Sequence, residues 1–150
     1  MEKLLVETSG GRSSGFMAKT LMDSYSHKYE QVRVFANTGF ENEATLEFVR
    51  DCDNYFKFNT VWVEAVFNEK GKGTTHKIVT FETASRKGEP FVEMCKKYGI
   101  PNQNYKHCTR ELKLAPIHDY VKSIGWNKGD YKTAIGIRSD EPKRFKREIN

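Results

Sequence analysis

The sequence predicts an α/β domain in which helices flank a parallel, twisted sheet. Short apolar runs alternate with segments whose apolar residues recur at helical spacing. Two of these runs end in glycine-containing turns, at 9–15 and 37–39. With 150 residues, of which 37% are hydrophobic and 30% charged, the chain can bury one core. We therefore expect a single domain of parallel strands joined by crossover helices.

The first half of the chain predicts two strand–turn–helix units and a third strand. A buried strand at 4–6 precedes a helix through 18–25, and a strand at 32–36 precedes a helix that begins near Asn42. Residues 60–66 are rich in β-branched and aromatic side chains, which indicates the third strand. The apolar positions of the two helices are Ala18, Leu21, Met22 and Tyr25, and Leu46, Val49, Cys52 and Phe56.

The second half predicts a long excursion followed by two helices and a strand. Residues 68–89 contain three glycines and many charges, so only 78–81 is expected to be ordered there. The elements expected after it are a helix from Pro90 to Gly99, a helix from Pro116 to Gly125, a strand at 131–137 and a charged tail at 138–150.

The composition limits the possible classes of protein. Twenty-five Lys and Arg against twenty Asp and Glu give a net charge of +5, which suits an anionic ligand, nucleic acid included. The three cysteines form no C-x-x-C pair, so neither a zinc ribbon nor a structural disulfide is expected. No apolar run suits a signal peptide or a bilayer span, and we expect a cytoplasmic protein without membrane contact.

The turn at 9–15 is the first candidate for chemistry. It contains three glycines, three serines and a single charge, Arg12. Glycines let the backbone fold tightly around an anion, and the first amides of a helix point their N–H groups at it. Neither standard phosphate-loop pattern, G-x-x-x-x-G-K-[ST] or G-x-G-x-x-G, is present. The alternative is an ordinary Gly-Ser turn with a serine helix cap.

Three segments should meet at one edge of such a sheet. Ligands of parallel sheets bind beyond the carboxyl ends of the strands. Residues 9–14 and 37–39 follow predicted strands and residues 136–138 lie at the end of one, so all three segments fall at that edge.

Four motifs in this order resemble those of the PP-loop ATP pyrophosphatases and the phosphoadenosine phosphosulfate (PAPS) reductases. Residues 9–14 match S-G-G-x-[DT]-S except at Ser13, and 37–39 match N-T-G. Residues 108–116 match the reductases' C-x-x-x-x-K-x-x-P, and 136–142 are similar to G-I-R-x-D-E.

The resemblance implies an adenine nucleotide alpha-hydrolase-like fold, which is Rossmann-like, and ATP or PAPS as ligand, with Mg²⁺ accompanying ATP. It also implies attack on an activated phosphate or sulfonate, assisted by Arg12, Lys113 and Arg138. The residues that it places at the nucleotide are Ser9, Gly10, Gly11, Arg12, Ser13 and Ser14 at the phosphates, Asn37, Thr38 and Gly39 beside the adenine or ribose, and Gly136 and Arg138.

The sequence also departs from these families. Many members have Lys where Arg12 stands and Asp where Ser13 stands, so no metal ligand is expected at Ser13. Arg12 keeps the positive charge and can contact phosphate oxygens in pairs. The carboxyl-terminal E-C-G-x-H motif of the reductases is absent, and so are the paired cysteines of an iron–sulfur cluster. A reductase reaction would then need a thiol reductant or a partner protein.

Several candidates keep two interpretations. Cys108, the weaker catalytic candidate, is either a buried small hydrophobe or, beside basic His107 and Arg110, a redox group. Lys113 is either solvated or neutralises phosphate or sulfate, and Arg138 either forms a surface ion pair or binds phosphate. The basic residues Lys143, Arg144, Lys146 and Arg147 are either solvated or contact nucleic acid or an outer phosphate. His76 and His118 are expected to be structural.

Three functions remain open on sequence alone. The first is a PAPS reductase-family enzyme, the second a nucleotide-binding sensor or subunit without catalysis, and the third an ATP-dependent enzyme that delivers sulfur to nucleic acid. The sequence does not choose between a monomer and an oligomer.

Overall fold

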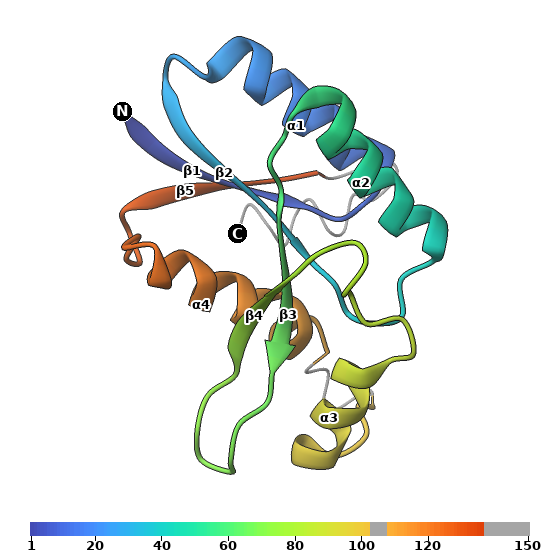
Figure 1. Cartoon of the computed structure of the whole chain (residues 1–150). Helices are drawn as coiled ribbons and strands as arrows, with labels where there is room; N and C mark the ends of the chain where they lie inside the picture. Colours follow the sequence, from blue (N-terminus) through green and yellow to red (C-terminus); the bar gives the residue numbers. More distant parts are fainter. Residues whose placement is uncertain (103–107, 137–150) are drawn as a thin grey trace.

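Five strands form one sheet with helices on both faces in the computed structural model, which describes residues 1–102 and 108–136 (Figure 1). The strands are β1 (Glu2–Thr8), β2 (Tyr29–Ala36), β3 (Val61–Val66), β4 (Thr75–Val79) and β5 (Tyr131–Ile135). The helices are α1 (Arg12–Tyr25), α2 (Glu43–Phe56), α3 (Glu89–Tyr98), a π-helix (Arg110–Leu114) and α4 (Ala115–Ser123). The predicted α/β class, with helices flanking a mostly parallel sheet, is confirmed.

The strand order is β4-β3-β2-β1-β5. β1 lies between β2 and β5 and is parallel to both, and β2 is parallel to β3. Only the pairing of β3 with β4 is antiparallel among the described strands. The chain therefore builds the sheet outward from β1 in one direction and then returns to add β5 on the other side.

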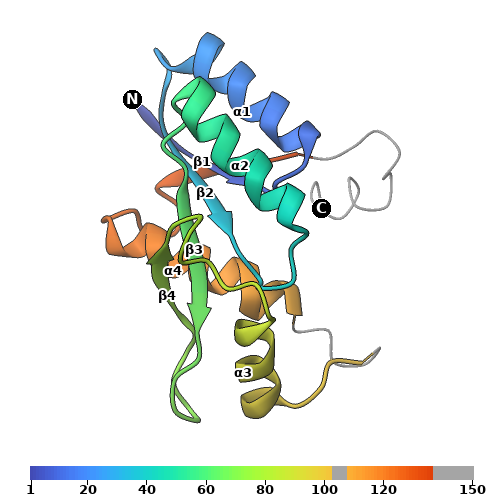
Figure 2. The same cartoon turned by 45° about the vertical axis from the view of Figure 1, so that its right-hand side comes forward.

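Alternating side chains of β1 divide the core between the two faces. Leu4 and Val6 pack with Ala18 and Cys52 under α1 and α2, which lie side by side (Figures 1 and 2). Leu5 points to the opposite face and packs with residues of α4. α3 packs at the carboxyl end of β3. No helix in the described part of the chain is long and apolar enough to cross a membrane.

The expectation that only 78–81 is ordered in the excursion is wrong. Thr75–Val79 forms β4, while Phe81 lies in the turn that follows. Lys77 and Ile78 are exposed on this strand and Val79 is buried. β4 is an edge strand that pairs with β3 alone, so few of its side chains are buried. Its sequence therefore lacks the apolar run by which a strand is predicted.

The last helix begins earlier than expected. Helical backbone runs from Cys108 through the π-helix into α4, so Pro116 does not open the helix but lies inside it. Proline lacks an N–H and crowds the preceding turn. The wider π-turn, in which the Ala115 N–H reaches the Arg110 carbonyl, lets the chain pass this residue without a break.

The remaining boundaries are close to the predicted ones. α2 begins next to Asn42, Pro90 lies in the first turn of α3 and Gly99 ends it, as predicted, and Asn42 also caps α2. β5 stops at Ile135, two residues before the expected end. Residue 137 and the charged tail lie outside the described residues.

Candidate functional site

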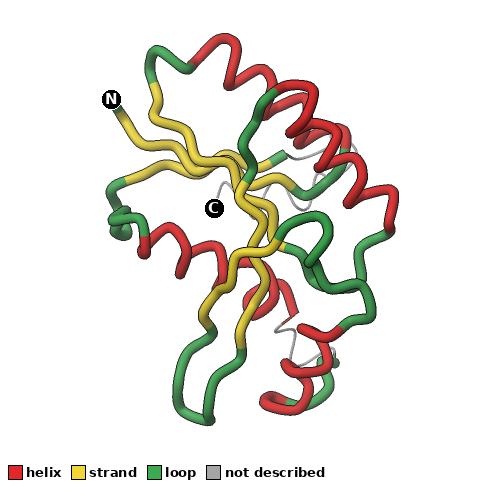
Figure 3. Tube along the Cα trace, viewed as in Figure 1, coloured by secondary structure: helices red, strands yellow, loops and turns green. Residues whose placement is uncertain are grey.

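The point at which the strand order reverses lies between β1 and β5. In open α/β sheets, ligands bind beyond the carboxyl ends of the strands at such a point. The turn that joins β1 to α1 and the residue that follows β5, Gly136, are both located there. Figure 3 colours the loops and turns green, those at the carboxyl ends of the strands among them.

Gly136 packs directly on the turn at 9–14. A Cβ atom at Gly136 would lie 2.9 Å from the Ser14 Cα and 3.0 Å from the Ser14 nitrogen. Only glycine allows this approach of the two backbones. The structure therefore brings together two of the segments predicted to share an edge, whereas Arg138 lies outside the described residues.

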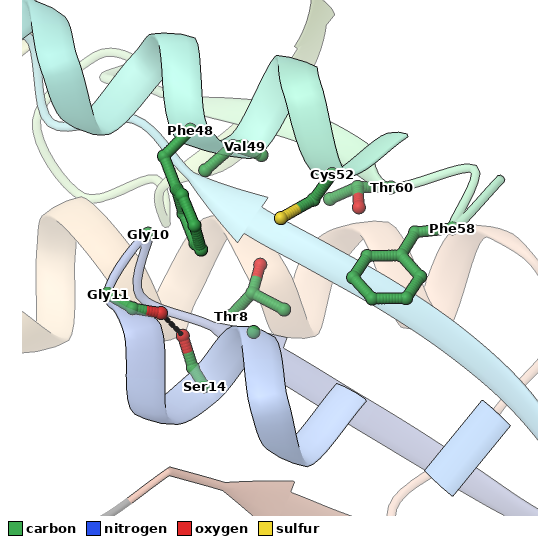
Figure 4. Close-up of a pocket in the computed structure, with 10 residues that line it drawn as sticks. Thr8, Gly10, Gly11, Ser14, Phe48, Val49, Cys52, Phe58 and Thr60 are labelled. Atoms are coloured by element: carbon green, nitrogen blue, oxygen red, sulfur yellow. Dashed lines mark hydrogen bonds between the residues drawn. The ribbon is translucent and has the colours of Figure 1, made fainter. Parts of the chain in front are cut away.

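Two serines hold the turn in shape from within. The buried Ser14 hydroxyl donates to the Gly11 carbonyl at 3.0 Å, drawn as the dashed line in Figure 4, and accepts from the Ser9 N–H at 3.1 Å. The two hydroxyls lie 3.2 Å apart, and Ser9 Oγ also accepts from the Gly11 N–H. Neither serine caps α1, because its N-cap residue is Gly11, which has no side chain to accept from the N–H groups of the first turn.

Gly10 and Gly11 differ in what they do for the fold. Gly10 has φ +84°, and a Cβ there would lie 2.3 Å from Thr45 Cγ2 on α2. Gly11 has φ −91°, and a Cβ there would meet only Ser9 Oγ, at 3.5 Å. The fold therefore requires glycine at position 10, while position 11 is exposed and open.

No described group of the chain neutralises the partial positive charge at the start of α1. The first turn holds no acidic residue and no cap. Arg12 and Ser13 are exposed, and Arg12 forms no ion pair with a described residue. Free N–H groups and the helix dipole give this end a partial positive charge, to which Arg12 adds a full one.

The second predicted turn, which follows β2, is occupied by its own side chains. Asn37 is fully buried, and its Nδ2 donates to Glu64 Oε2 at 2.8 Å and to the Ser85 carbonyl at 2.9 Å. Gly39 has φ +90°, and its carbonyl accepts from the Gly88 N–H at 3.0 Å. Thr38 Oγ1 lies 3.2 Å from Glu41 Oε1.

Sequence reasoning missed Glu64 and Ser85. A signal was available, because Glu64 interrupts the apolar strand run 61–66 at a buried position. A charged residue within such a run either faces solvent or has partners in the core.

The start of α2 is capped and charged. The Asn42 side chain accepts from the Ala44 N–H at 2.9 Å, and Glu43 stands in the first turn. Arg86 Nε donates to Glu43 Oε2 at 2.8 Å, and this hydrogen bond lowers the pKa of the Glu43 carboxyl. This helix start offers no place for a further anion.

A small cavity between α1 and α2 lies behind the turn (Figure 4). Its volume is about 10 Å³, and its walls include Gly10, Phe48, Val49 and Cys52. Such a space holds no more than about one water molecule. Burial, and then the nearby carboxylates of the same helix, raise the pKa of the Cys52 thiol. A ligand of the turn must therefore lie on its outer side, away from Cys52.

The third motif lies on the sheet face opposite α1. Cys108 is partly buried and packs against the buried cluster of Ala65, Met94 and Leu112. Lys113 is half-buried on the π-helix. Within the described part of the chain, no hydrogen bond or ion pair joins either side chain to the turn at 9–14. His107 and the basic residues 143–147 are outside the described residues.

His76 connects β4 to α4. Its Nδ1 lies 2.6 Å from Asp119 Oδ2, and its backbone N–H donates to the same oxygen. Both partners are partly buried, which gives His76 a structural partner. His118 is exposed on α4. Residues 1–102 and 108–136 contain no group of three metal-ligating His, Cys, Asp or Glu side chains.

Three proteins similar to this chain are uncharacterized. The nin region protein ORF290 of Escherichia phage lambda is 34% identical over 147 residues, which are 95% of this chain and 50% of that protein. The Methanocaldococcus jannaschii protein MJ0066 is 29% identical over 108 residues, 72% of this chain and 17% of that protein.

A second protein of that archaeon, MJ0973, is 27% identical over 89 residues, 59% of this chain and 16% of that protein. The chain thus spans half the lambda protein and less than a fifth of each archaeal protein. No family model matches the chain, and no solved structure matches it.

Proposed function

We propose that this chain is a PP-loop domain related to the PAPS reductases, which binds an adenine nucleotide, ATP or PAPS, with its phosphates at Ser9–Ser14. One observation carries the proposal. The start of α1 lies at the reversal of strand order, has neither cap nor acid, and carries an exposed Arg12. An anion there would accept hydrogen bonds from backbone N–H groups and neutralise the guanidinium.

The proposed chemistry is attack on the activated sulfonate or phosphate of the bound nucleotide. Preorganised amides and Arg12 would stabilise the charge that builds on the transferred group. Lys113 and Arg138 are proposed to assist through their positive charge, and Gly136 to keep the turn in place. Since Cys52 is enclosed and Cys108 packs into a core cluster, a thiol for PAPS reduction would come from a reductant or a partner protein.

The position of the described cysteines favours a second candidate, a nucleotide-binding module or subunit without catalysis. Such a module needs the turn and no nucleophile. Delivery of sulfur to nucleic acid with ATP as activator is a third possibility, which the net charge of +5 suits.

Calorimetric titration of the purified chain with ATP, PAPS and adenylyl sulfate tests the binding. Gly11→Val should abolish it and leave the fold intact, because the side chain projects into open space where phosphate would lie. Gly73→Val is the matched control, since a Cβ at this exposed loop glycine meets nothing within 4 Å. Normal nucleotide binding by Gly11→Val would show that the turn at 9–14 does not hold the phosphates.

Product analysis separates the three functions. We expect little or no sulfite from PAPS and thioredoxin, because an external thiol lacks the effective concentration of an enclosed one. Rapid release that disappears in Cys108→Ser would make Cys108 the nucleophile, and release that survives it would indicate direct attack by the external thiol. Conversion of ATP to AMP and pyrophosphate would favour sulfur transfer to nucleic acid, and tight binding without turnover the module.

A further inference from the structure

Glu64 on β3 is a completely buried carboxylate with three hydrogen-bond donors. Its Oε2 accepts from Asn37 Nδ2 at 2.8 Å and from the Ser85 N–H at 2.6 Å, and its Oε1 accepts from Ser85 Oγ at 2.7 Å. Each of these described partners donates to a carboxylate oxygen. It forms no ion pair with a described residue.

These contacts join three separate segments at the carboxyl edge. Asn37 belongs to the turn after β2, Glu64 to β3, and Ser85 to the segment that leads into α3. Asn37 Nδ2 also donates to the Ser85 carbonyl, so both partners of Glu64 bond to each other. The Gly39 carbonyl accepts from the Gly88 N–H, which ties the same two segments together again.

Burying a charge is costly, and donors offset the cost only when the geometry is good. Apolar packing would hold these segments together at less cost, as it does under α4. What the carboxylate adds is direction, since each donor must lie along a lone pair. The turn at 37–42 is thereby fixed relative to β3 rather than merely packed against it.

We infer that Glu64 is a positioning residue for the nucleotide site, acting through Asn37 and Ser85 to fix the turn at 37–42 as a wall beside the phosphate turn. The inference rests on the proposed function. With no exposed surface, Glu64 cannot touch a ligand itself.

Glu64→Gln tests the inference, because it removes the negative charge from all three hydrogen bonds, and an amide nitrogen in the Oε2 position would face two donors, Asn37 Nδ2 and the Ser85 N–H. We expect ATP affinity to fall about tenfold or more, the effect of one lost charge-assisted hydrogen bond. Inorganic pyrophosphate, which needs only the turn at 9–14, should bind with unchanged affinity. The control is Val121→Ala, a core truncation under α4 that should lower the Tm without changing ATP affinity.

Two further variants keep the test decisive if Glu64→Gln does not fold. Ser85→Ala removes a single hydroxyl bond and should weaken ATP binding about threefold. Ser85→Thr keeps a hydroxyl donor for Glu64 Oε1 and should retain the wild-type affinity for ATP.

The outcomes separate the two proposals. Wild-type ATP affinity in both Glu64→Gln and Ser85→Ala, or equal weakening of ATP and pyrophosphate, would overturn the positioning role while the proposed function stands. If the wild-type chain binds neither ATP nor PAPS, the proposed function is overturned, and the positioning role with it.

Discussion

The two glycine-containing turns at the carboxyl edge follow adjacent parallel strands and lead into helices. Only one of these helix starts is capped and neutralised by the chain's own side chains. After β2, the start of α2 receives Asn42 as cap and Glu43 as acid, and Arg86 pairs with that acid. After β1, the start of α1 receives neither cap nor acid. The comparison teaches that glycine content does not mark an anion site. What distinguishes the two turns is whether the chain itself neutralises the helix start that follows.

The largest effect should come from Gly10, which the fold itself requires. Gly10→Ala places a side chain at φ +84° and within 2.3 Å of Thr45 Cγ2. We expect a loss of about 2 to 4 kcal/mol of unfolding free energy, from backbone strain and overpacking together. Urea unfolding measures it. Gly11→Ala is the control and should cost no more than about 1 kcal/mol, because Gly11 is the N-cap of α1 and Ala is a poorer N-cap residue than Gly. Equal losses in both variants would remove the distinction between the two glycines.

Arg12 tests whether the open helix start binds an anion. Arg12→Ala should weaken ATP binding by about 1.5 to 3 kcal/mol, the usual worth of a charge-assisted hydrogen bond. Arg50→Ala is a suitable control, because Arg50 lies on α2 and already pairs with Asp51. Titration calorimetry compares them. Unchanged affinity in Arg12→Ala would make Arg12 an ordinary surface residue.

Asn42 and Ser13 sharpen the comparison of the two helix starts. Asn42→Ala removes the cap of α2 and should cost about 1 kcal/mol of stability. Ser13→Ala, at an exposed site in the first turn of α1, removes no cap and should leave the Tm nearly unchanged. Thermal unfolding distinguishes them. A larger loss in Ser13→Ala would show that α1 depends on a serine after all.

Glu43 should give the smallest effect, and one that depends on pH. The hydrogen bond from Arg86 lowers the pKa of Glu43 in the folded state below its ordinary value of 4.5. The carboxylate therefore stabilises the fold at neutral pH, and this contribution disappears as the pH falls through the lowered pKa. The Tm difference between wild type and Glu43→Gln should vanish in acid. A difference that is constant with pH would contradict this role.

The pattern of apolar residues was sufficient to predict the helices and the parallel strands, because packing on a sheet leaves a periodic trace in the sequence. β4 escaped prediction since an edge strand with exposed Lys77 and Ile78 leaves no such trace. The early start of the last helix was not predicted, because proline is common in the first turn of a helix, whereas here Pro116 follows a π-turn inside the helix.

The candidate site was predictable only in part. Residues 9–14 and 136 could be placed at one edge, because parallel strands end on the same side. The contact between Glu64 and Ser85 could not be predicted, since it joins a strand to a segment expected to be irregular. A hydrogen bond between two residues far apart in the chain produces no periodic sequence pattern from which it could be predicted.

The contact of Gly136 with Ser14 ties the stiffness of the turn at 9–14 to the stability of β5. β5 is the outermost strand on its side of the described sheet, bonded to β1 alone. Outer strands are among the first elements to open in native-state fluctuations, and their amides then exchange hydrogen with solvent. Each opening of β5 would remove the backbone that braces Ser14. A ligand that tightens the turn would therefore slow amide exchange along β5, at the opposite end of the sequence from the residues that it contacts.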